Sequence, residues 1–281
     1  MKFMVADVFA DPARAGFPGT TGNRAGVVWL QDSVTFPSDI YMARLAARYG
    51  YSETVFVLAG GPATYKLRYF TPVDEVDFCG HATLAAFELL RSLGVLDGFS
   101  ASALTKAGTV RVEWNGKEIF MEMVPSRTVR FFSSRESLDL YRAFGLEPSL
   151  RFTPEIICTG LSDILLAADS KEQLDTLEPH FEMISALSQL YGVVGFHVFY
   201  VPEMFRGKIY CRNFAPLYGI PEEAATGTSN ASLAFYLFRH GYDVSHCVCI
   251  QGESMGKSSL VTVRHNGQSM RVGGLSLIIN K

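Results

Sequence analysis

Apolar side chains recur at helical spacing in four segments of the chain, and a glycine suited to end a helix directly follows each segment. The segments cover residues 42–49, 83–93, 181–191 and 233–240. Between the helices lie runs rich in β-branched and aromatic residues, such as 65–70 and 110–114, which predict strands. The pattern indicates strands, a helix, more strands, a tight turn and a second helix, in that order, in each half of the chain.

Three landmarks occur twice in the same order, which indicates an internal repeat. A Tyr-Gly pair leads into a strand-like run, the pattern Arg-x-Phe-x-Pro follows, and a glycine then opens a helical stretch. The first copies begin at residues 49, 68 and 80, and the second copies begin at 191, 212 and 227, so the offsets are 142, 144 and 147. A drift this small is what loop insertions produce, and the chain is therefore predicted to contain two copies of one supersecondary unit.

Length and composition set broad limits on the protein. A chain of 281 residues allows one large domain or two of about 140 residues. We place a boundary at the start of the polar stretch 125–148, which gives halves 1–124 and 125–281. A net charge of −3 argues against a nucleic-acid partner. Because no apolar run approaches the length of a membrane span and the N-terminus lacks the basic-then-apolar pattern of a signal peptide, we expect a cytoplasmic protein without a membrane partner. The five cysteines have no regular spacing and predict no disulfide framework.

Three short motifs resemble functional sites, but their sequence context does not support those functions. The segment 252–258 resembles a phosphate-binding loop, but it has three residues between its glycines where four are needed, and a strand-like run follows it. Cys247 and Cys249 share one strand face with no second ligand pair, so we interpret them as core residues. Asn230 begins a glycosylation sequence that has no meaning without secretion.

Two further segments turn through glycine into a helix at equivalent places in the repeats: residues 78–83 and 222–229. The first turn of a helix presents backbone N–H groups and a partial positive charge, which together suit a small anion. In the simpler interpretation, Gly80 and Gly227 only permit tight turns, and Thr83 and Thr228 cap the helices. The residues alone leave both interpretations open.

A set of motifs resembles the PhzF family of phenazine-biosynthesis-like isomerases. The similarity runs in order from residue 7 to residue 274. Its motifs are Asp7-Val8-Phe9, Gly22-Asn23, Ser52-Glu53-Thr54-Val55-Phe56, Asp77-Phe78-Cys79-Gly80-His81-Ala82-Thr83, Thr159-Gly160-Leu161-Ser162-Asp163, Arg212-x-Phe214-x-Pro216, Glu222 to Thr228, Gln251-Gly252 and Val272-Gly273-Gly274.

The resemblance implies the α+β fold of diaminopimelate epimerase. In that fold two pseudo-symmetric halves each wrap a curved sheet or barrel round a central helix, the site lies in the cleft between them, and the last strand can return to the first half. The resemblance also implies a cytoplasmic homodimer that acts on a small carboxylic acid and uses neither a cofactor nor a metal.

The family's site residues match positions in this chain one by one. Glu53 matches the acid/base that moves a proton between carbons of a small unsaturated acid, and His81 and Glu223 match the polar catalytic residues that hold and polarise it. Residues that match its substrate-binding groups are Ser52, Gly80, Gly227 and Thr228. We expect a dry site to raise the pKa of Glu53, as an effective base requires.

Two departures and two alternatives qualify this picture. The family usually has Asp and Pro where this chain has Glu223 and Ala224. The longer side chain of Glu moves the carboxylate, and a misplacement of about 1 Å can cost about 10²-fold in rate. The sequence therefore does not identify the substrate. The first alternative is a two-base amino-acid racemase or epimerase that uses Cys79, although the partner position holds Thr226 and not a thiol. The second is a non-catalytic protein that binds small acids.

Overall fold

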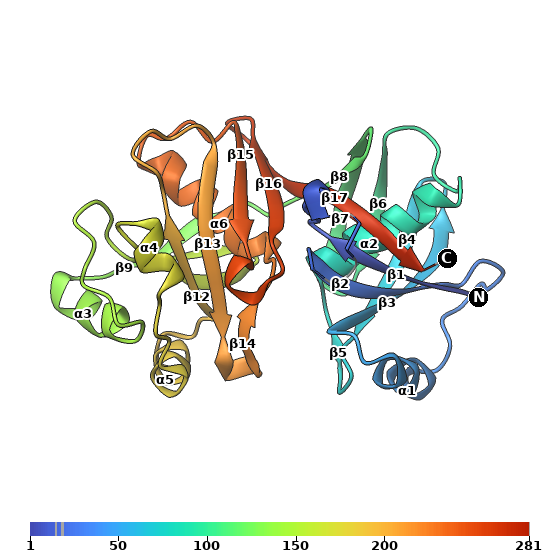
Figure 1. The fold of residues 1–281 in the computed structure, drawn as a ribbon. Helices are drawn as coiled ribbons and strands as arrows, with labels where there is room; N and C mark the ends of the chain where they lie inside the picture. The colour runs from blue at the N-terminus through green and yellow to red at the C-terminus, as the bar shows by residue number, and fades with distance from the viewer. Residues whose placement is uncertain (15, 18–19, 281) are drawn as a thin grey trace. The chain divides into compact units, whose positions relative to one another are not determined.

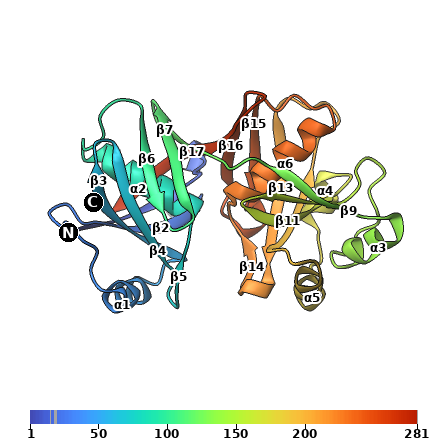
Figure 2. The ribbon, with the colours of Figure 1, turned by 180° about the vertical axis from the view of Figure 1, so that it is seen from behind.

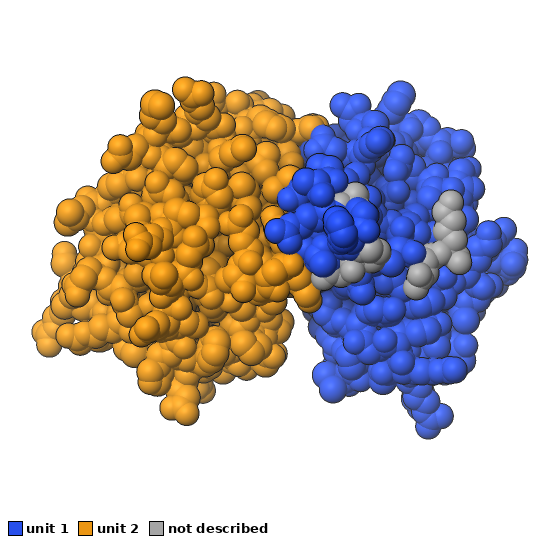
Figure 3. Space-filling view, in the orientation of Figure 1, with its two compact units in different colours: residues 1–122, 273–281 blue, residues 123–272 orange. Residues whose placement is uncertain are grey.

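The computed structural model describes residues 1–14, 16–17 and 20–280 (Figure 1). The chain forms two compact units (Figure 3). Unit 1 contains residues 1–122 and 273–281, and unit 2 contains residues 123–272. In the described residues, no helix is long and apolar enough to cross a membrane.

Unit 1 is built on a closed ring of eight strands. Its elements are β1 (Lys2–Val8), η1 (Pro12–Arg14), β2 (Asn23–Trp29), α1 (Asp39–Tyr49), β3 (Glu53–Gly61), β4 (Thr64–Phe70), β5 (Glu75–Val76), α2 (Gly80–Ser92), β6 (Ser100–Thr105), β7 (Gly108–Asn115), β8 (Glu118–Glu122) and most of β17 (Met270–Asn280). Antiparallel pairs join β1 to β2, β3 to β4, β6 to β7 and β7 to β8, and parallel pairs join β2 to β3 and β4 to β6. β17 closes the ring because it pairs with both β8 and β1.

The closure by β17 depends on a glycine. A Cβ atom at Gly273 would collide with the carbonyl oxygen of Ile119 in β8. Only a residue without a side chain lets the two backbones approach this closely.

Helix α2 is the core of unit 1. All ten residues from His81 to Leu90 are buried, and the helix lies inside the strands in both views (Figures 1 and 2). A helix that is buried on every face must be mostly apolar on every face, and α2 therefore has no extended polar face. By contrast, α1 packs on the outer face of β2, β3 and β4 through a separate cluster of Met42, Ala46, Phe56 and Phe70.

Unit 2 repeats this succession of elements. Its elements are β9 (Arg127–Phe131), α3 (Ser134–Arg142), β10 (Glu155–Thr159), β11 (Leu161–Ala167), α4 (Lys171–Asp175), α5 (Phe181–Tyr191), β12 (Gly195–Tyr200), β13 (Lys208–Ala215), η2 (Pro216–Tyr218), β14 (Ile220–Glu223), α6 (Gly227–Arg239), β15 (His246–Gln251), η3 (Glu253–Met255) and β16 (Ser259–His265). As in unit 1, a helix connects each of two parallel strand pairs, β11 with β12 and β13 with β15.

The sequence landmarks occupy equivalent places in the two units. Gly50 ends α1 and Gly192 ends α5, both in the left-handed conformation with φ of 68° and 64°. Arg68 pairs with Glu75 at 2.6 Å in unit 1, and Arg212 pairs with Glu222 at 2.8 Å in unit 2.

The structure locates several segments singled out in the sequence. The polar stretch 125–148, at whose start the boundary is expected, contains β9 and the capped helix α3 of unit 2. The strand expected after the phosphate-loop-like segment is confirmed as β16. Asn230, Cys247 and Cys249 are buried, as befits core residues.

A buried polar network holds the turn between β14 and α6. The side-chain amide of Gln251 donates to the carbonyl oxygen of Glu223 at 2.7 Å and to the Thr226 hydroxyl at 3.1 Å. Its oxygen accepts from the Thr226 N–H at 3.2 Å and from Asn230 at 2.8 Å. One glutamine thus fixes both ends of the turn that carries Glu223.

The network continues through a neutral histidine. The Asn230 oxygen lies 3.2 Å from Nε2 of His197, and Asn213 Nδ2 lies 3.2 Å from its Nδ1. Because Asn230 uses its amide group to donate elsewhere, its oxygen must accept, which places the proton of His197 on Nε2. Asn213 also donates to Ser229, and Ser229 donates to Asp163 at 2.6 Å. Burial lowers the pKa of His197 to about 4, which keeps the ring uncharged.

We predict that His197 makes unit 2 sensitive to acid. The folded pKa of about 4 lies below the unfolded value near 6.5, so the unfolded chain binds the extra proton first. The free energy of unfolding should therefore fall as pH drops from about 6.5 towards 4, by about 3 kcal/mol for this group. Urea unfolding of the wild type and of His197→Gln across this range measures the effect. Asp163 and Glu223, the charged neighbours of the ring, stay in both proteins, and equal pH slopes would refute the prediction.

Candidate active site

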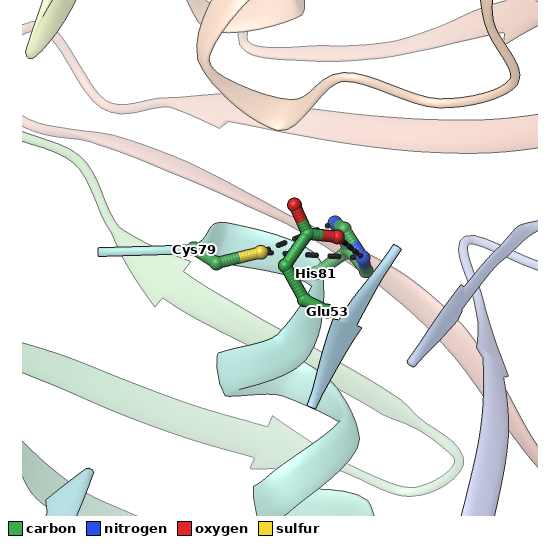
Figure 4. A group of neighbouring side chains, drawn as sticks. All are labelled: Glu53, Cys79 and His81. Carbon is green, nitrogen blue, oxygen red and sulfur yellow. Dashed lines mark hydrogen bonds and ion pairs between the residues drawn. The ribbon is translucent and has the colours of Figure 1, made fainter. Parts of the chain in front are cut away.

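A glutamate and a histidine form an ion pair at the N-terminus of α2. Glu53 is the first residue of β3, and His81 is the second residue of α2. Oε2 of Glu53 lies 3.1 Å from Nε2 of His81, with side-chain exposures of 19% and 7% (Figure 4). The strand start brings the carboxylate there because Glu53 pairs in register with Ala25 of β2, and Asn23 of the same strand contacts His81.

Other side chains surround His81. The thiol sulfur of Cys79 lies 3.4 Å from Nδ1 of the ring, and the amide nitrogen of Asn23 lies 3.5 Å from the same atom. Thr83 donates to the carbonyl oxygen of Cys79 at 2.8 Å and shares a hydrogen bond with Tyr69 at 2.7 Å. The imidazole is therefore contacted by Asn23 of β2, by Glu53 of β3 and by Cys79 at the helix N-cap.

The electrostatics of this cluster favour an ionised glutamate. Burial, the largest single influence, would raise the pKa of Glu53, but the charge and hydrogen bond of His81 and a hydrogen bond from Ser52 together lower it. Burial would lower the pKa of His81, yet the neighbouring Cys79 and Glu53 raise it well above 6.5. Burial, followed by the charge of Glu53, raises the pKa of the Cys79 thiol. The expectation that a dry site raises the pKa of Glu53 is wrong, because it left out the histidine partner.

Two other residues of unit 1, Ser52 and Gly80, match substrate-binding positions of the family. Ser52 is exposed, and its hydroxyl donates to the carbonyl oxygen of Arg24 at 3.1 Å. Gly80 is the first residue of α2, and a Cβ there would lie 2.6 Å from the terminal methyl of Met121. Glycine at this position lets the Met121 side chain pack against the backbone at the start of the helix.

The unit 2 residues gather at the N-terminus of α6. Glu223 ends β14, and Gly227 and Thr228 are the first two residues of the helix. The Thr226 hydroxyl donates to Oε2 of Glu223 at 2.6 Å, so one oxygen of this carboxylate has a fixed direction. Glu223, Gly227 and Thr228 are all half-buried, which leaves them accessible to a small molecule.

The repeat shows that the two units carry different chemistry at equivalent positions. Glu53, the first residue of β3, pairs with β2, and Gly195, the first residue of β12, pairs with β11 in the same way. No side chain fits at Gly195, because a Cβ atom there would collide with the carbonyl oxygen of Phe214. Cys79 and Thr226 are both N-caps, with φ of −144° and −131°. The carboxylate and the thiol of unit 1 thus have no counterpart of the same type in unit 2.

Sequence reasoning assigned no role to Asn23 or Gln251, although both lie within the motifs of the resemblance. Asn23 contacts the site histidine, and Gln251 fixes the turn of Glu223. Neither role follows from spacing, because each residue reaches its partner across more than 25 residues of chain.

Comparisons with known proteins agree with this geometry. The family described as "Phenazine biosynthesis-like protein" (PhzC-PhzF) matches residues 7–280. An uncharacterized isomerase of Clostridium acetobutylicum is 30% identical over 93% of this chain and 92% of its own length. The trans-2,3-dihydro-3-hydroxyanthranilate isomerase of Pseudomonas chlororaphis is 29% identical over 95% of this chain and 91% of its own.

A solved structure shows the same fold. The PhzF-family protein of Bacillus anthracis superimposes with a TM-score of 0.81 at 24% identity, and the match covers 100% of this chain and 98% of that one. With its mixed α/β architecture and a family match over nearly its whole length, this chain belongs to the PhzF family of phenazine-biosynthesis-like proteins and is an isomerase of that family.

Proposed function

We propose that this protein is a cofactor-independent isomerase that moves a proton on a small unsaturated or amino carboxylic acid, with Glu53 as its acid and base. The observation that carries the proposal is the ion pair of Glu53 with His81 at 3.1 Å. It supplies an ionised, partly exposed carboxylate beside a hydrogen-bond donor. The activity named for the Pseudomonas chlororaphis relative is of the same reaction type.

The proposed reaction needs one group that both removes and returns a proton. The Glu53 carboxylate takes a proton from one carbon of the substrate, and the electron pair shifts along the conjugated system. Glu53 then returns the proton to another carbon, so the enzyme ends as it began. Negative charge that develops on the substrate is stabilised by the His81 imidazolium and by N–H groups of the first turn of α2.

In unit 2, Glu223, Gly227 and Thr228 are the proposed substrate-binding residues. Gly227 and Thr228 offer donors to a carboxylate, as helix N-termini do. Glu223 repels an anion, so its carboxylate would face a donor on the substrate such as an ammonium or hydroxyl group. The longer arm of Glu223 relative to the Asp usual in the family favours a substrate other than the phenazine precursor. A cytoplasmic homodimer stays a prediction of the resemblance.

The racemase alternative has less support. Two-base racemisation needs an acid or base on each face of the substrate carbon, and the position equivalent to Cys79 holds Thr226, whose hydroxyl is bonded to Glu223. A single thiol cannot replace the pair.

Glu53→Gln should lower turnover by about 10²–10⁴-fold, because it keeps the shape of the side chain but removes the base. Substrates would be trans-2,3-dihydro-3-hydroxyanthranilate and any small conjugated or amino acid that raises the melting temperature. Product formation in D₂O, followed by NMR, measures both the rate and deuterium uptake. Glu147→Gln, a change at an exposed glutamate, is the control. Full activity in Glu53→Gln together with its loss in Cys79→Ser would transfer the role to the thiol.

The pH profile of kcat/KM should have two limbs set by the ion pair. Its acid limb should lie below the ordinary range of a glutamate, because the pKa of Glu53 is lowered and protonation removes the base. Its alkaline limb should lie above the ordinary range of a histidine, because the pKa of His81 is raised and deprotonation removes the donor. A profile of Cys79→Ser separates the thiol from the histidine. An alkaline limb that persists in His81→Gln would show that His81 does not set it.

Glu223→Gln should weaken binding more for amino-substituted acids than for their hydroxy analogues. The substitution removes the charge from a charge-assisted hydrogen bond, which is about twice as strong as a neutral one. Calorimetric titration with matched pairs of acids measures the difference, and Glu203→Gln, at another exposed glutamate, is the control. Equal losses for both members of each pair would place Glu223 away from the donor group of the substrate.

A further inference from the structure

The polar network behind Glu223 is a chain of hydrogen bonds, and the direction of each bond in it can be assigned. The direction of the bonds decides which state of the Glu223 carboxylate the chain stabilises. The last two side chains, Thr226 and Glu223, are half-buried and lie at or just before the N-terminus of α6. The four side chains behind them are buried: Asn213, His197, Asn230 and Gln251.

Backbone groups fix the orientation of the Gln251 amide. A backbone carbonyl oxygen can only accept a hydrogen bond, and a backbone N–H can only donate one. Nε2 of Gln251 lies 2.7 Å from the carbonyl oxygen of Glu223, and its Oε1 lies 3.2 Å from the N–H of Thr226. The opposite orientation would set acceptor against acceptor and donor against donor. The second proton of Nε2 is therefore donated to the Thr226 hydroxyl oxygen, at 3.1 Å.

The orientation of Asn230 is fixed in the same way. Its Nδ2 donates to the carbonyl oxygen of Thr226 at 2.9 Å and to Oε1 of Gln251 at 2.8 Å. Its oxygen therefore accepts, and it receives the Nε2 proton of His197 at 3.2 Å. Nδ1 of His197 in turn accepts from Asn213 at 3.2 Å. The bonds from Asn213 onward are therefore all donated in one direction, towards the turn between β14 and α6.

The last bond of the chain is donated to the Glu223 carboxylate. The Thr226 hydroxyl has one proton, and its oxygen already accepts from Gln251. That proton is therefore donated to Oε2 of Glu223, at 2.6 Å. A separation of about 2.5–2.7 Å is usual between a hydroxyl group and an ionised oxygen. A proton on Oε2 would place two protons in this bond, so the chain favours the ionised carboxylate with Oε2 as an acceptor.

The scaffold does not require this chain. Asn213 pairs with Glu223 across β13 and β14, and Tyr69 pairs with Val76 at the equivalent place in β4 and β5. Unit 1 thus forms the same strands and the following helix around an aromatic and an apolar side chain. Polar groups are costly to bury unless their hydrogen bonds are made. A chain that unit 2 holds at this cost points to a role in the site.

We propose that Thr226 is a positioning residue of the isomerase, and that the chain behind it holds Glu223 as an acceptor that selects substrates with a donor group. An ionised carboxylate accepts from a hydroxyl or ammonium group of the substrate and repels a carbonyl or ether oxygen. The selection of substrates rests on the proposed function, whereas the direction of the chain does not. Without the Thr226 hydroxyl, Glu223 takes up a proton from solvent more readily and can then donate to a substrate oxygen.

Two acids of matched shape test the selection. The probes are 3-hydroxycyclohexanecarboxylate, which offers a donor, and 3-oxocyclohexanecarboxylate, which offers only an acceptor. Thr226→Val keeps the shape of the side chain and removes the hydroxyl. In calorimetric titrations the wild type should prefer the hydroxy acid, and Thr226→Val should reduce this preference by about tenfold because it binds the oxo acid more tightly than the wild type does. Structural damage would weaken the binding of both acids, so a gain of affinity separates the two effects.

Two further variants complete the titrations. Thr226→Ser keeps the hydroxyl and should keep the wild-type preference. Thr128→Val removes a hydroxyl that lies 3.3 Å from the carboxylate of Glu155 in the same unit, and it should leave the preference unchanged. A wild-type preference in Thr226→Val, or a preference lost equally in Thr226→Ser, would overturn the positioning role.

The direction of the chain has a test that needs no ligand. In protein labelled with ¹⁵N-histidine, two-bond ¹H–¹⁵N spectra distinguish a protonated ring nitrogen from a bare one. At neutral pH, His197, assigned by its loss in His197→Gln, should have its proton on Nε2 in the wild type and in Thr226→Val. A proton on Nδ1, or on both nitrogens, would overturn the proposal. The expected tautomer in a protein that binds neither acid would instead contradict the proposed function and leave the direction of the chain standing.

Discussion

The ion pair of Glu53 and His81 is the interaction on which the site depends. An imidazolium at the N-terminus of α2 is disfavoured by the helix dipole, by about 0.3–1 kcal/mol for an exposed group, and burial adds several kcal/mol. The carboxylate of Glu53, 3.1 Å away, offsets both costs. The same contact lowers the pKa of the carboxylate, which burial alone would raise. Each partner therefore favours the charged form of the other.

The two units of the internal repeat share one scaffold but carry different residues at equivalent positions. Both units keep the parallel strand pairs, the left-handed glycines after α1 and α5, and an arginine–glutamate pair. The units differ at the first residue of β3 and of β12, because unit 1 carries Glu53 there and unit 2 carries Gly195. A proton shuttle that removes and returns one proton needs one base, and a single copy can supply it. The second copy is then free to hold Glu223 on a turn fixed by Gln251.

The two units also stabilise their polar groups in different ways. In unit 1 the buried charges of the site compensate each other directly, and the surrounding groups are few. In unit 2 the hydrogen bonds run from Asp163 through Ser229, Asn213, His197 and Asn230 to Gln251, with the histidine neutral. Such a network stabilises a single geometry because each amide must present a defined end to its neighbour.

The sequence by itself determined the local elements and their repetition. Helix periodicity with glycine stops located α1, α2, α5 and α6, and the glycines expected to open two of these helices, Gly80 and Gly227, are the first residues of α2 and α6. The motifs of the resemblance identified Glu53, His81 and Glu223. Only the tertiary structure decided the direction of the Glu53 pKa and the roles of Asn23 and Gln251. These depend on contacts between residues far apart in the chain, and periodicity and capping, which act over one or two turns, carry no information about such contacts.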